Sequence, residues 1–459
     1  MTWVLLALGV VEALLGLNAH RPVRSPTWLS IFSFFAGWLT AELAVWHLIV
    51  AVPLAAGLAV GGADELPGQI GLGLTVFGLA LVLLSLRHAH DAARAMHVAL
   101  DDLVLAPSAS PGRPSLFMPL VSGLRGPFVR ERDLVYHQEG RLALKLDVYA
   151  PATPREGRRA PMLMQIHGGA WIVGSKREQG IPMVKHMAAH GWVCLNVDYR
   201  LSPRATFPDP VVDLKRAIVW AKAHAEELGA DPEFIVLTGG SAGGHLSALV
   251  ALTPNDPEYQ PGFESEDTRV QGCVPFYGVY DFTSKTGIRR DAIARGLVER
   301  FIMKKRMQDA LHDYERASPI RRAGADRPPF LVVHGTNDSL AVVEEARAFV
   351  ERLRETSPAP AFYAEIPGAQ HAFDVFASIR TEMVLVGVRR FLTWLYEEHE
   401  RARTEARPAL GRARLAEESR PEPSDQIAVN VVTNVEPPED SRPARTMPLP
   451  GTKQSLSAK

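Results

Sequence analysis

The sequence contains very little cysteine and almost no net charge. Two cysteines in 459 residues cannot form a disulfide framework, and a cysteine-ligated metal site would need more of them. Both Cys194 and Cys273 lie within apolar strand-like runs, so we expect small buried thiols and not a reactive pair. The 50 basic and 51 acidic residues leave a formal charge of -1, which gives no general attraction to nucleic acid. A content of 47% hydrophobic and 22% charged residues excludes disorder throughout.

Long apolar stretches are confined to the first 90 residues. They lie at residues 3–17, 28–60 and 69–86. A spanning helix needs about 20 apolar residues, so the first and third stretches qualify as short spans. The second is too long for one span and carries Glu42, His47 and Pro53, so it is either one tilted helix with an interfacial extension or two short helices that turn near Glu42. We expect residues 1–90 to form about three membrane spans, with Glu42 at a turn or helix contact; an intramembrane functional site is the alternative.

The basic residues beside these stretches predict an orientation. With three single crossings, the pair Arg21 and Arg24 shares a side with Arg87 and Arg94, which places the main domain on the cytoplasmic side. Four crossings would put the two pairs on opposite sides. A cleaved secretory signal is another interpretation of the first stretch, but the sequence Met-Thr-Trp lacks the positive region that such signals carry.

From about residue 130 the pattern changes to short β-branched and aromatic runs that alternate with amphipathic helices. The expected strands are 133–137, 143–149, 162–167, 192–199, 234–238, 270–277, 330–334 and 361–366. The clearest helix covers 208–229, where apolar residues recur at helical spacing and Gly229 ends it. This alternation is typical of a mostly parallel sheet covered by helices. We therefore expect an α/β catalytic domain over residues 130–400.

Two segments beside this domain lack such a pattern. Residues 91–129 carry four prolines between positions 107 and 119, which break regular structure, so we expect a linker or entry segment. Residues 401–459 are rich in Arg, Glu, Pro and Ser, and we expect a disordered tail. The apolar island at 427–435 is either a docking segment or an incidental run.

A candidate nucleophile follows the strand at 234–238. The sequence Gly-Gly-Ser-Ala-Gly-Gly surrounds Ser241, and a helix is expected from Ser241 to Leu252, which gives Gly-x-Ser-x-Gly in a strand-turn-helix setting. Such a turn holds the serine in a strained conformation that only small neighbours permit. Because glycine is frequent, at 36 of 459 residues, the motif alone is weak evidence and its context must decide.

A glycine-containing loop precedes the nucleophile along the chain. His167-Gly168-Gly169-Ala170-Trp171 directly follows the strand at 162–166. The amides of Gly168 and Gly169, together with the N–H of Ala242, would stabilise a tetrahedral oxyanion, and losing one such donor typically costs about 3–4 kcal/mol. A plain glycine turn is the alternative interpretation.

The remaining catalytic candidates follow the last two strands. Asp338 comes after the strand at 330–334 and His371 after the strand at 361–366, which gives the chain order Ser, Asp, His that this sheet architecture requires. His371 would take the proton from Ser241, and Asp338 would hold the imidazole tautomer and stabilise its cation.

Other residues compete for these roles. Asp281 and Asp374 are alternative acids. Among the remaining histidines, His334 is expected to be buried structure, His245 is a candidate pocket residue, and His167 is expected to orient the glycine loop instead of acting as a base.

These features together resemble the α/β-hydrolase carboxylesterases of the hormone-sensitive-lipase-like group. The matching stretches are Leu146-Asp147-Val148-Tyr149-Ala150-Pro151, the His-Gly-Gly loop, Val197-Asp198-Tyr199-Arg200-Leu201-Ser202-Pro203, the helix with Asp213, Gly-Gly-Ser-Ala-Gly-Gly-His, and the Asp338 and His371 loops. The resemblance implies an α/β-hydrolase fold, with a mostly parallel eight-stranded sheet and a small cap, and ester hydrolysis through a Ser241 acyl-enzyme without cofactor or metal. Two departures, Ala170 for the third loop glycine and Gly240 before the nucleophile, affect the subgroup and substrate range. Residues 207–215 also look like feruloyl and acetyl esterases and isoprenylcysteine methylesterases.

The expected function is a membrane-anchored serine carboxylesterase for short- to medium-chain esters. Its partners would be a small-molecule or lipid ester and membrane lipid, with no nucleic acid, and the sequence gives no signal of oligomeric state. An amidase or peptidase of the same fold and a non-catalytic interaction protein are the alternatives.

An insertion at 284–312 is expected to cap the pocket. Its cations are Arg289, Arg290, Arg295, Arg300, Lys304 and Lys305. They fit either a mobile lid that meets lipid head groups or a solvated helical face.

Overall fold

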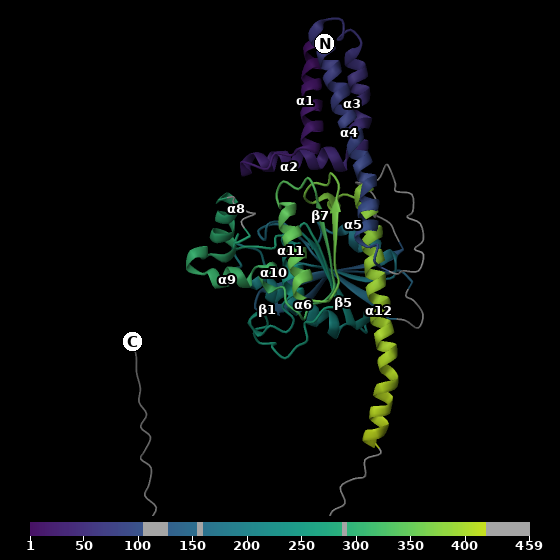
Figure 1. Cartoon of the computed structure of the whole chain (residues 1–459), viewed down its shortest axis with the longest axis vertical. Coiled ribbons are helices and arrows are strands. Elements are labelled where there is room, and N and C mark those ends of the chain that lie inside the picture. The colour runs from purple at the N-terminus through teal and green to yellow at the C-terminus, as the bar shows by residue number, and fades with distance from the viewer. Residues whose placement is uncertain (104–126, 154–158, 287–291, 419–459) are drawn as a thin grey trace, which may run out of the picture. The chain divides into compact units, whose positions relative to one another are not determined.

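Four helices precede an eight-stranded sheet in the computed structural model (Figure 1), which describes residues 1–103, 127–153, 159–286 and 292–418. The chain divides into two units, Met1–Arg403 and Thr404–Lys459. Every contact described below lies within the first unit.

The N-terminal helices are α1 (Thr2–His20), α2 (Thr27–Glu42), α3 (Ala44–Ala59) and α4 (Leu66–Ala99). By length and composition α1 and α4 could each cross a membrane. The helices α2 and α3 form an apolar pair, bent by 86° at its break, that could be a third span. The second expected stretch is therefore two helices that turn beside Glu42, not one tilted helix. The turn is made at Leu43, where a φ of -104° and a ψ of 23° end α2.

Small residues bring α1 and α4 close together. A Cβ added to Gly9 would overlap the carbonyl of Gly71, and one added to Gly78 would overlap the backbone of Glu12. Such close backbone approach is the usual way in which membrane helices associate. Glu12 also lies 2.7 Å from His47 Nε2 of α3, so the acid inside the first apolar run is paired within the helix group.

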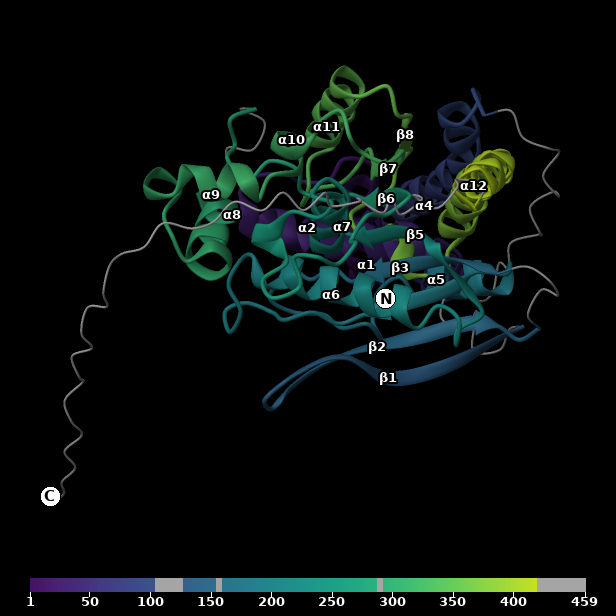
Figure 2. The same ribbon diagram turned by 90° about the horizontal axis from the view of Figure 1, so that it is seen from below.

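The sheet has the strand order β1-β2-β4-β3-β5-β6-β7-β8 (Figure 2). Its strands are β1 (Phe128–Glu139), β2 (Leu142–Pro151), β3 (Ala160–Ile166), β4 (Val193–Val197), β5 (Ala230–Gly240), β6 (Gly272–Phe276), β7 (Phe330–Gly335) and β8 (Ala361–Ile366). The pairs β1–β2 and β2–β4 are antiparallel and all others are parallel. All eight expected strands are present, so the prediction of a mostly parallel sheet is confirmed.

Helices cover both faces of this sheet. They are α5 (Ile181–Ala189), α6 (Asp209–Ala223), α7 (Ala242–Ala251), α8 (Ala292–Leu297), α9 (Leu311–Arg316), α10 (Pro319–Arg322), α11 (Val343–Thr356) and α12 (Ile379–Glu418), with the short turns η1 (Pro257–Tyr259), η2 (Val298–Met303), η3 (Met307–Asp309) and η4 (Phe373–Val375). One core holds α6, α7 and α11, and the other holds α5, α12 and the second half of α4.

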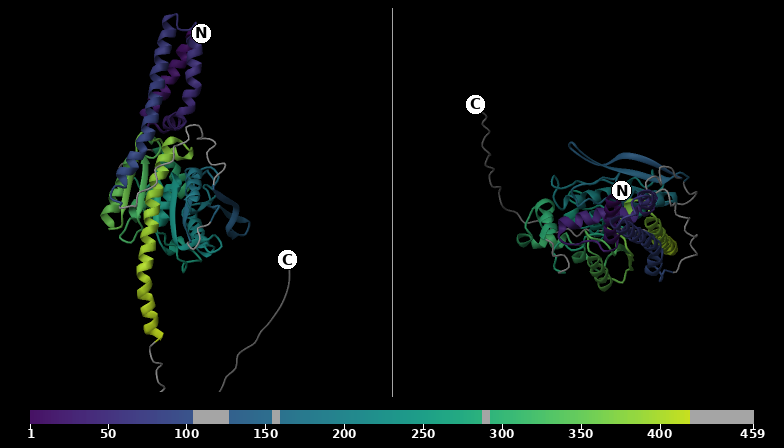
Figure 3. Two further views of the ribbon diagram at one scale, coloured as in Figure 1. Left: turned by 90° about the vertical axis from the view of Figure 1, so that its right-hand side faces the viewer. Right: turned by 90° about the horizontal axis from the view of Figure 1, so that it is seen from above.

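The helix α4 therefore belongs to both parts of the first unit. Its buried residues Ala92 and Met96 pack in the same core as the strands and α12, and Figure 3 shows α4 continuing from the N-terminal helices along the side of the sheet. A rigid helix that is long enough to cross a bilayer and also packs on the sheet fixes the sheet's distance from the N-terminal helices.

Three expected boundaries were wrong. The helix expected over 208–229 ends at Ala223, where α6 gives way to turns before Gly229 with its φ of +64°. The expected linker at 91–129 begins as helix, since α4 runs to Ala99. The expected tail also begins as helix, because α12 continues to Glu418. The prolines at 107–119 and the apolar island at 427–435 lie outside the described residues.

Candidate active site

Ser241 lies at a sharp turn between β5 and α7. Its φ of 58° and ψ of -118° place a non-glycine residue in a rarely occupied region, and its N–H donates to Phe276 O at 3.0 Å. A Cβ added to Gly239 would lie 2.5 Å from Ile166 O, and one added to Gly243 would overlap the same carbonyl. The glycines of the motif therefore allow β3 to pass directly beside the turn, and the strain is concentrated on the serine, as at many reactive residues.

Asp338 and His371 are paired by a buried hydrogen bond. His371 Nδ1 lies 2.7 Å from Asp338 Oδ2, while Asp338 Oδ1 accepts from the amides of Leu340 at 2.9 Å and Ala341 at 2.8 Å. Burial alone would raise the pKa of Asp338, but the imidazoles of His371 and His334 hold that pKa well below its ordinary value. An ionised Asp338 requires the proton on Nδ1 of His371, which leaves Nε2 as the nitrogen that accepts a proton.

Tyr277 connects His371 to the strand that leads to Ser241. Its ring centroid lies 4.7 Å from that of His371, and a Cβ added to Gly240 would lie 2.5 Å from the phenol oxygen. The phenol therefore occupies the space that a side chain at position 240 would need. This explains why glycine stands before Ser241, a position at which the sequence departs from the family that it resembles.

The two alternative acids make other contacts. The Asp374 carboxylate accepts a hydrogen bond from the Tyr277 hydroxyl, and burial raises the pKa of Asp374 to about 6. Asp281 accepts from the amide of Thr283 at 2.9 Å and of Thr286 at 3.0 Å. Among the described residues, the carboxylate bonded to His371 is that of Asp338.

The glycine loop lies beside Ser241. A Cβ on Gly168 would come within 3.2 Å of Ser241 Cβ, and Gly169 has a φ of +113°. However, the Gly168 N–H donates to Gln179 Oε1 at 2.7 Å, so this amide is engaged inside the loop. The amides of Gly169 and Ala242 donate to no described residue. The sequence could not show this difference, because Gln179 reaches the loop only through the fold.

Three further histidines have structural contacts. His167 is buried, its Nδ1 lies 2.8 Å from Gly168 O, and burial lowers its pKa, which suits a loop-orienting role. His334 is fully buried and bonds Ala341 O at 2.8 Å through Nε2. His245 is held on one side by Trp171 Nε1 at 3.1 Å and on the other by Ala317 O.

The expected cap is partly anchored to the core. Ile302 and Met303 are buried, and the Phe207 N–H donates to Ile302 O at 3.0 Å. Lys305 forms an ion pair of 2.6 Å with Asp313. Arg289 and Arg290 lie outside the described residues.

Both cysteines are buried and unpaired, with pKa values raised by burial, as expected.

An aromatic residue of α2 also faces the paired imidazole. The Phe34 ring lies edge-on to His371, with the centroids 6.1 Å apart. Trp38 Nε1 donates to Ala372 O at 2.9 Å. Sequence reasoning missed both contacts because it assigned the whole stretch to the membrane. The signal that could have found them is Glu42, an acid at the end of the same helix that needs a partner.

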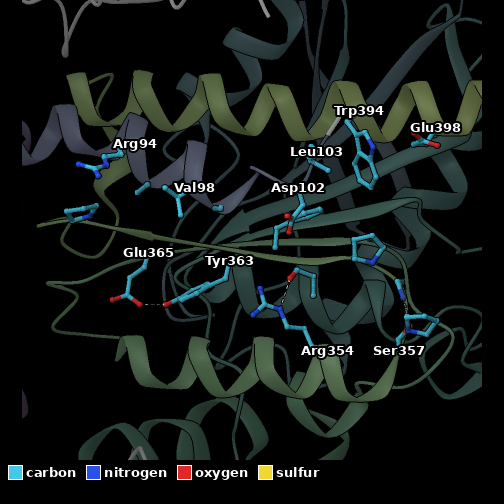
Figure 4. A pocket seen from close by; sticks show the side chains of 18 of the residues that line it. Arg94, Val98, Asp102, Leu103, Arg354, Ser357, Tyr363, Glu365, Trp394 and Glu398 are labelled. Carbon is cyan, nitrogen blue, oxygen red and sulfur yellow. Dashed lines mark hydrogen bonds between the residues drawn. The ribbon is translucent and has the colours of Figure 1, made fainter. Parts of the chain in front are cut away.

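Two other features lie away from these residues. An open groove of about 1620 Å³ runs between α4, α11, α12 and β8 and is lined by Arg94, Asp102, Tyr363 and Trp394 among others (Figure 4). A cluster of Asp231, His399 and Glu400 has the ligand types for a metal. Arg403 already pairs with Asp231 at 3.2 Å and with Glu400 at 2.7 Å, which places a positive charge where a cation would bind.

Comparison with known proteins shows clear relatives. The family model described as BD-FAE matches residues 146–353. The probable carboxylic ester hydrolase LipM of Mycobacterium tuberculosis is 40% identical over 420 residues, covering 88% of this chain and 96% of LipM. Esterase LipQ of the same organism is 43% identical over 271 residues, covering 59% of this chain and 64% of LipQ. A propionate-bound esterase structure from Thermogutta terrifontis is 31% identical, covers 53% of this chain and 85% of that one, and has a TM-score of 0.45.

Proposed function

Because the chain belongs to the carboxylic ester hydrolases of the α/β-hydrolase class, we propose that it cleaves short- to medium-chain esters through a covalent acyl-enzyme on Ser241. His371 is the general base and then the general acid, and Asp338 orients and stabilises the imidazole. The observation that carries the proposal is the buried bond of 2.7 Å between His371 and Asp338 at the same sheet edge as the strained Ser241 turn.

In the first half-reaction, Ser241 Oγ attacks the ester carbonyl carbon while its proton passes to His371 Nε2. The carbonyl π electrons move to oxygen, and the amides of Gly169 and Ala242 receive the resulting oxyanion. The intermediate then collapses, the C–O bond to the alcohol breaks, and the alkoxide takes the proton from His371. The ionised Asp338 stabilises the imidazolium that exists between these two proton transfers.

In the second half-reaction, water attacks the acyl carbon and gives its proton to His371. The bond to Ser241 Oγ breaks, the serine recovers its proton, and the carboxylic acid leaves. All proton transfers use one nitrogen of one residue, so the reaction requires no cofactor or metal ion.

The proposed place of the protein is a membrane, with the catalytic domain on the cytoplasmic side. Three crossings by α1, α3 and α4 would leave Arg24 beside the catalytic domain, and Arg24 Nη2 donates to Thr336 O at 2.9 Å. Arg87 follows the apolar part of α4 on that same side, while Asp64 and Glu65 join the far ends of α3 and α4. This distribution agrees with an excess of basic residues on the cytoplasmic side.

The test is a stopped-flow assay with a chromogenic ester and the matched amide, using detergent-solubilised full-length protein. The proposal predicts a burst of alcohol close to one equivalent per enzyme, no burst from Ser241→Ala, and much slower cleavage of the amide. Absence of a burst together with unchanged turnover in Ser241→Ala would remove Ser241 from the reaction. An amide cleaved as fast as the ester would make the protein an amidase of this fold.

A further inference from the structure

The helix α2 touches both loops that carry the proposed acid and base. Ser339, next to Asp338, donates through Oγ to Ser30 O at 3.5 Å. On the other loop, the Trp38 indole bonds Ala372 O at 2.9 Å and stacks on Phe376 with centroids 4.7 Å apart. One helix outside the catalytic sheet thus fixes the two loops relative to each other.

Phe34 is the residue of α2 that faces the base itself. It is 8% exposed, His371 is 6% exposed, and their rings meet edge to face at 6.1 Å. An ester whose leaving oxygen receives a proton from His371 must place its alcohol or acyl portion close to that imidazole. Phe34 is therefore placed to form an apolar wall of the ester site, beyond any residue contributed by the sheet.

The opposite face of α2 is apolar and open. Its exposed side chains are Trp28, Ile31, Phe32, Phe35 and Leu39, each between 44% and 68% exposed. Their spacing of three and four positions puts them on one side of the helix. The described part of α2 carries no charged residue before Glu42, so water is a poor solvent for this face.

The direction of α2 matches a helix that lies in the plane of a membrane surface. Its axis turns by 86° into α3, and Figure 1 shows it lying across the catalytic sheet where α1, α3 and α4 join it. If α1 and α4 cross the bilayer, α2 lies at its surface with the aromatic face toward lipid. Amphipathic helices at this depth bury that face about 5–10 Å into the boundary between head groups and acyl chains.

A buried ion pair holds α2 to the base loop. Glu42 Oε1 accepts from Arg380 Nε at 2.8 Å and Glu42 Oε2 accepts from Ser378 Oγ at 2.6 Å, while another nitrogen of Arg380 donates to Pro367 O at the start of the His371 loop. Both ionic side chains are at most 1% exposed. This link keeps α2 seated on the active-site loops.

From this geometry we infer that α2 is a wall of the active site at the membrane surface, that Phe34 determines specificity, and that the substrate is an ester dissolved in the bilayer. The inference rests on the proposed function and adds its substrate class and route of entry. The exposed face of α2 contacts the bilayer, and the ester passes from the bilayer beside Phe34 to Ser241.

The test uses full-length protein reconstituted in phosphatidylcholine vesicles, with p-nitrophenyl decanoate in the bilayer and p-nitrophenyl acetate in water. Phe34→Ala should lower kcat/KM for the decanoate about tenfold, mainly through KM, because the variant loses an apolar contact with the bound chain. Phe77→Ala, on α4 and away from the exposed α2 face, is the matched control, with a side chain 46% exposed, and should change kcat/KM less than about twofold. Equal effects of the two variants would overturn the specificity role.

A separate variant tests whether the ester enters the site from the bilayer. The double change Phe32→Asp with Phe35→Asp places charge on the lipid-facing side, so it should reduce decanoate turnover about tenfold or more and leave acetate turnover within about twofold. An equal loss on both substrates, or no loss on either, would overturn the membrane route. Phosphonate labelling of Ser241 in every variant confirms folding. Absence of labelling in the wild type would instead contradict the proposed function.

Discussion

Asp338 and Asp374 are both buried near His371, but their hydrogen-bond partners and the directions of their pKa shifts differ. Asp338, in the loop after β7, accepts from two backbone amides and from His371, and the imidazoles of His371 and His334 hold its pKa low. Asp374, in the turn η4, accepts from the Tyr277 phenol, and burial, together with the nearby Glu42 charge, raises its pKa to about 6. Because burial raises the pKa of both carboxylates, the hydrogen-bond donors and nearby charges decide which of the two has a lowered pKa beside His371.

Replacing Asp338 and Asp374 in turn by asparagine should give the largest difference in activity between the two carboxylates. Asp338→Asn favours the wrong tautomer of His371, so kcat for a chromogenic ester should fall by about 10⁴. Asp374→Asn still accepts a hydrogen bond from Tyr277 and should change kcat by less than about tenfold. Steady-state kinetics with both variants measures this, and similar losses in the two would mean that both acids act on the base.

Removing the charge of Glu42, whose field also acts on Asp374, should lower the stability of the fold. Glu42→Gln leaves Arg380 buried without its anion, and breaking one partner of a buried ion pair costs about 3–5 kcal/mol of stability. The thermal unfolding temperature of the detergent-solubilised protein should drop accordingly. The double variant Glu42→Gln with Arg380→Gln should recover part of the loss, and a single variant as stable as wild type would show that the pair is not formed.

Stability as a function of pH should also distinguish the two carboxylates. Folding raises the pKa of Asp374 from 3.8 to about 6, so the folded state favours its protonated form. Its contribution is complete below pH 3.8 and is lost as the pH rises through about 6, at a cost on the order of 2–3 kcal/mol. Asp374→Asn has no proton to lose, so its unfolding temperature relative to wild type should rise between about pH 4 and pH 7.5. A constant difference would show that Asp374 is ionised throughout.

Removing the Tyr277 hydroxyl should have the smallest effect of these changes. Tyr277→Phe removes the donor to Asp374 but leaves Asp338, His371 and the ring contact in place, so stability should fall by about 1–3 kcal/mol near pH 7 and kcat should change severalfold at most. Unfolding curves and ester kinetics measure the two effects. A kcat loss approaching that of Asp338→Asn would place the phenol in the catalytic reaction.

The sheet and the spacing of the active-site candidates were predictable because they depend on local pattern. Strand β8 is found at the same residues as expected, 361–366, since a short apolar run between turn residues has few alternative structures. The chain positions of Asp338 and His371 follow from the rule that parallel strands place their carboxyl ends at one edge. Their hydrogen bond agrees with that expectation.

What the sequence could not reveal are contacts between distant segments. The partner of Phe34 lies 337 residues away, and an apolar residue facing lipid cannot be told from one facing His371 by composition. The Gln179 side chain accepts a hydrogen bond from the Gly168 amide, and no sequence pattern predicts this contact. The end of α6 was missed because apolar periodicity weakens gradually, whereas the helix stops at one residue.

The most direct measurement of the central claim is the rate of phosphonylation at Ser241, mapped by mass spectrometry after exposure to a fluorophosphonate. The wild type and Asp374→Asn should carry the adduct on Ser241 at comparable rates, while Asp338→Asn should react more slowly by orders of magnitude. An adduct on another residue, or an Asp338→Asn variant that reacts as fast as the wild type, would contradict the account.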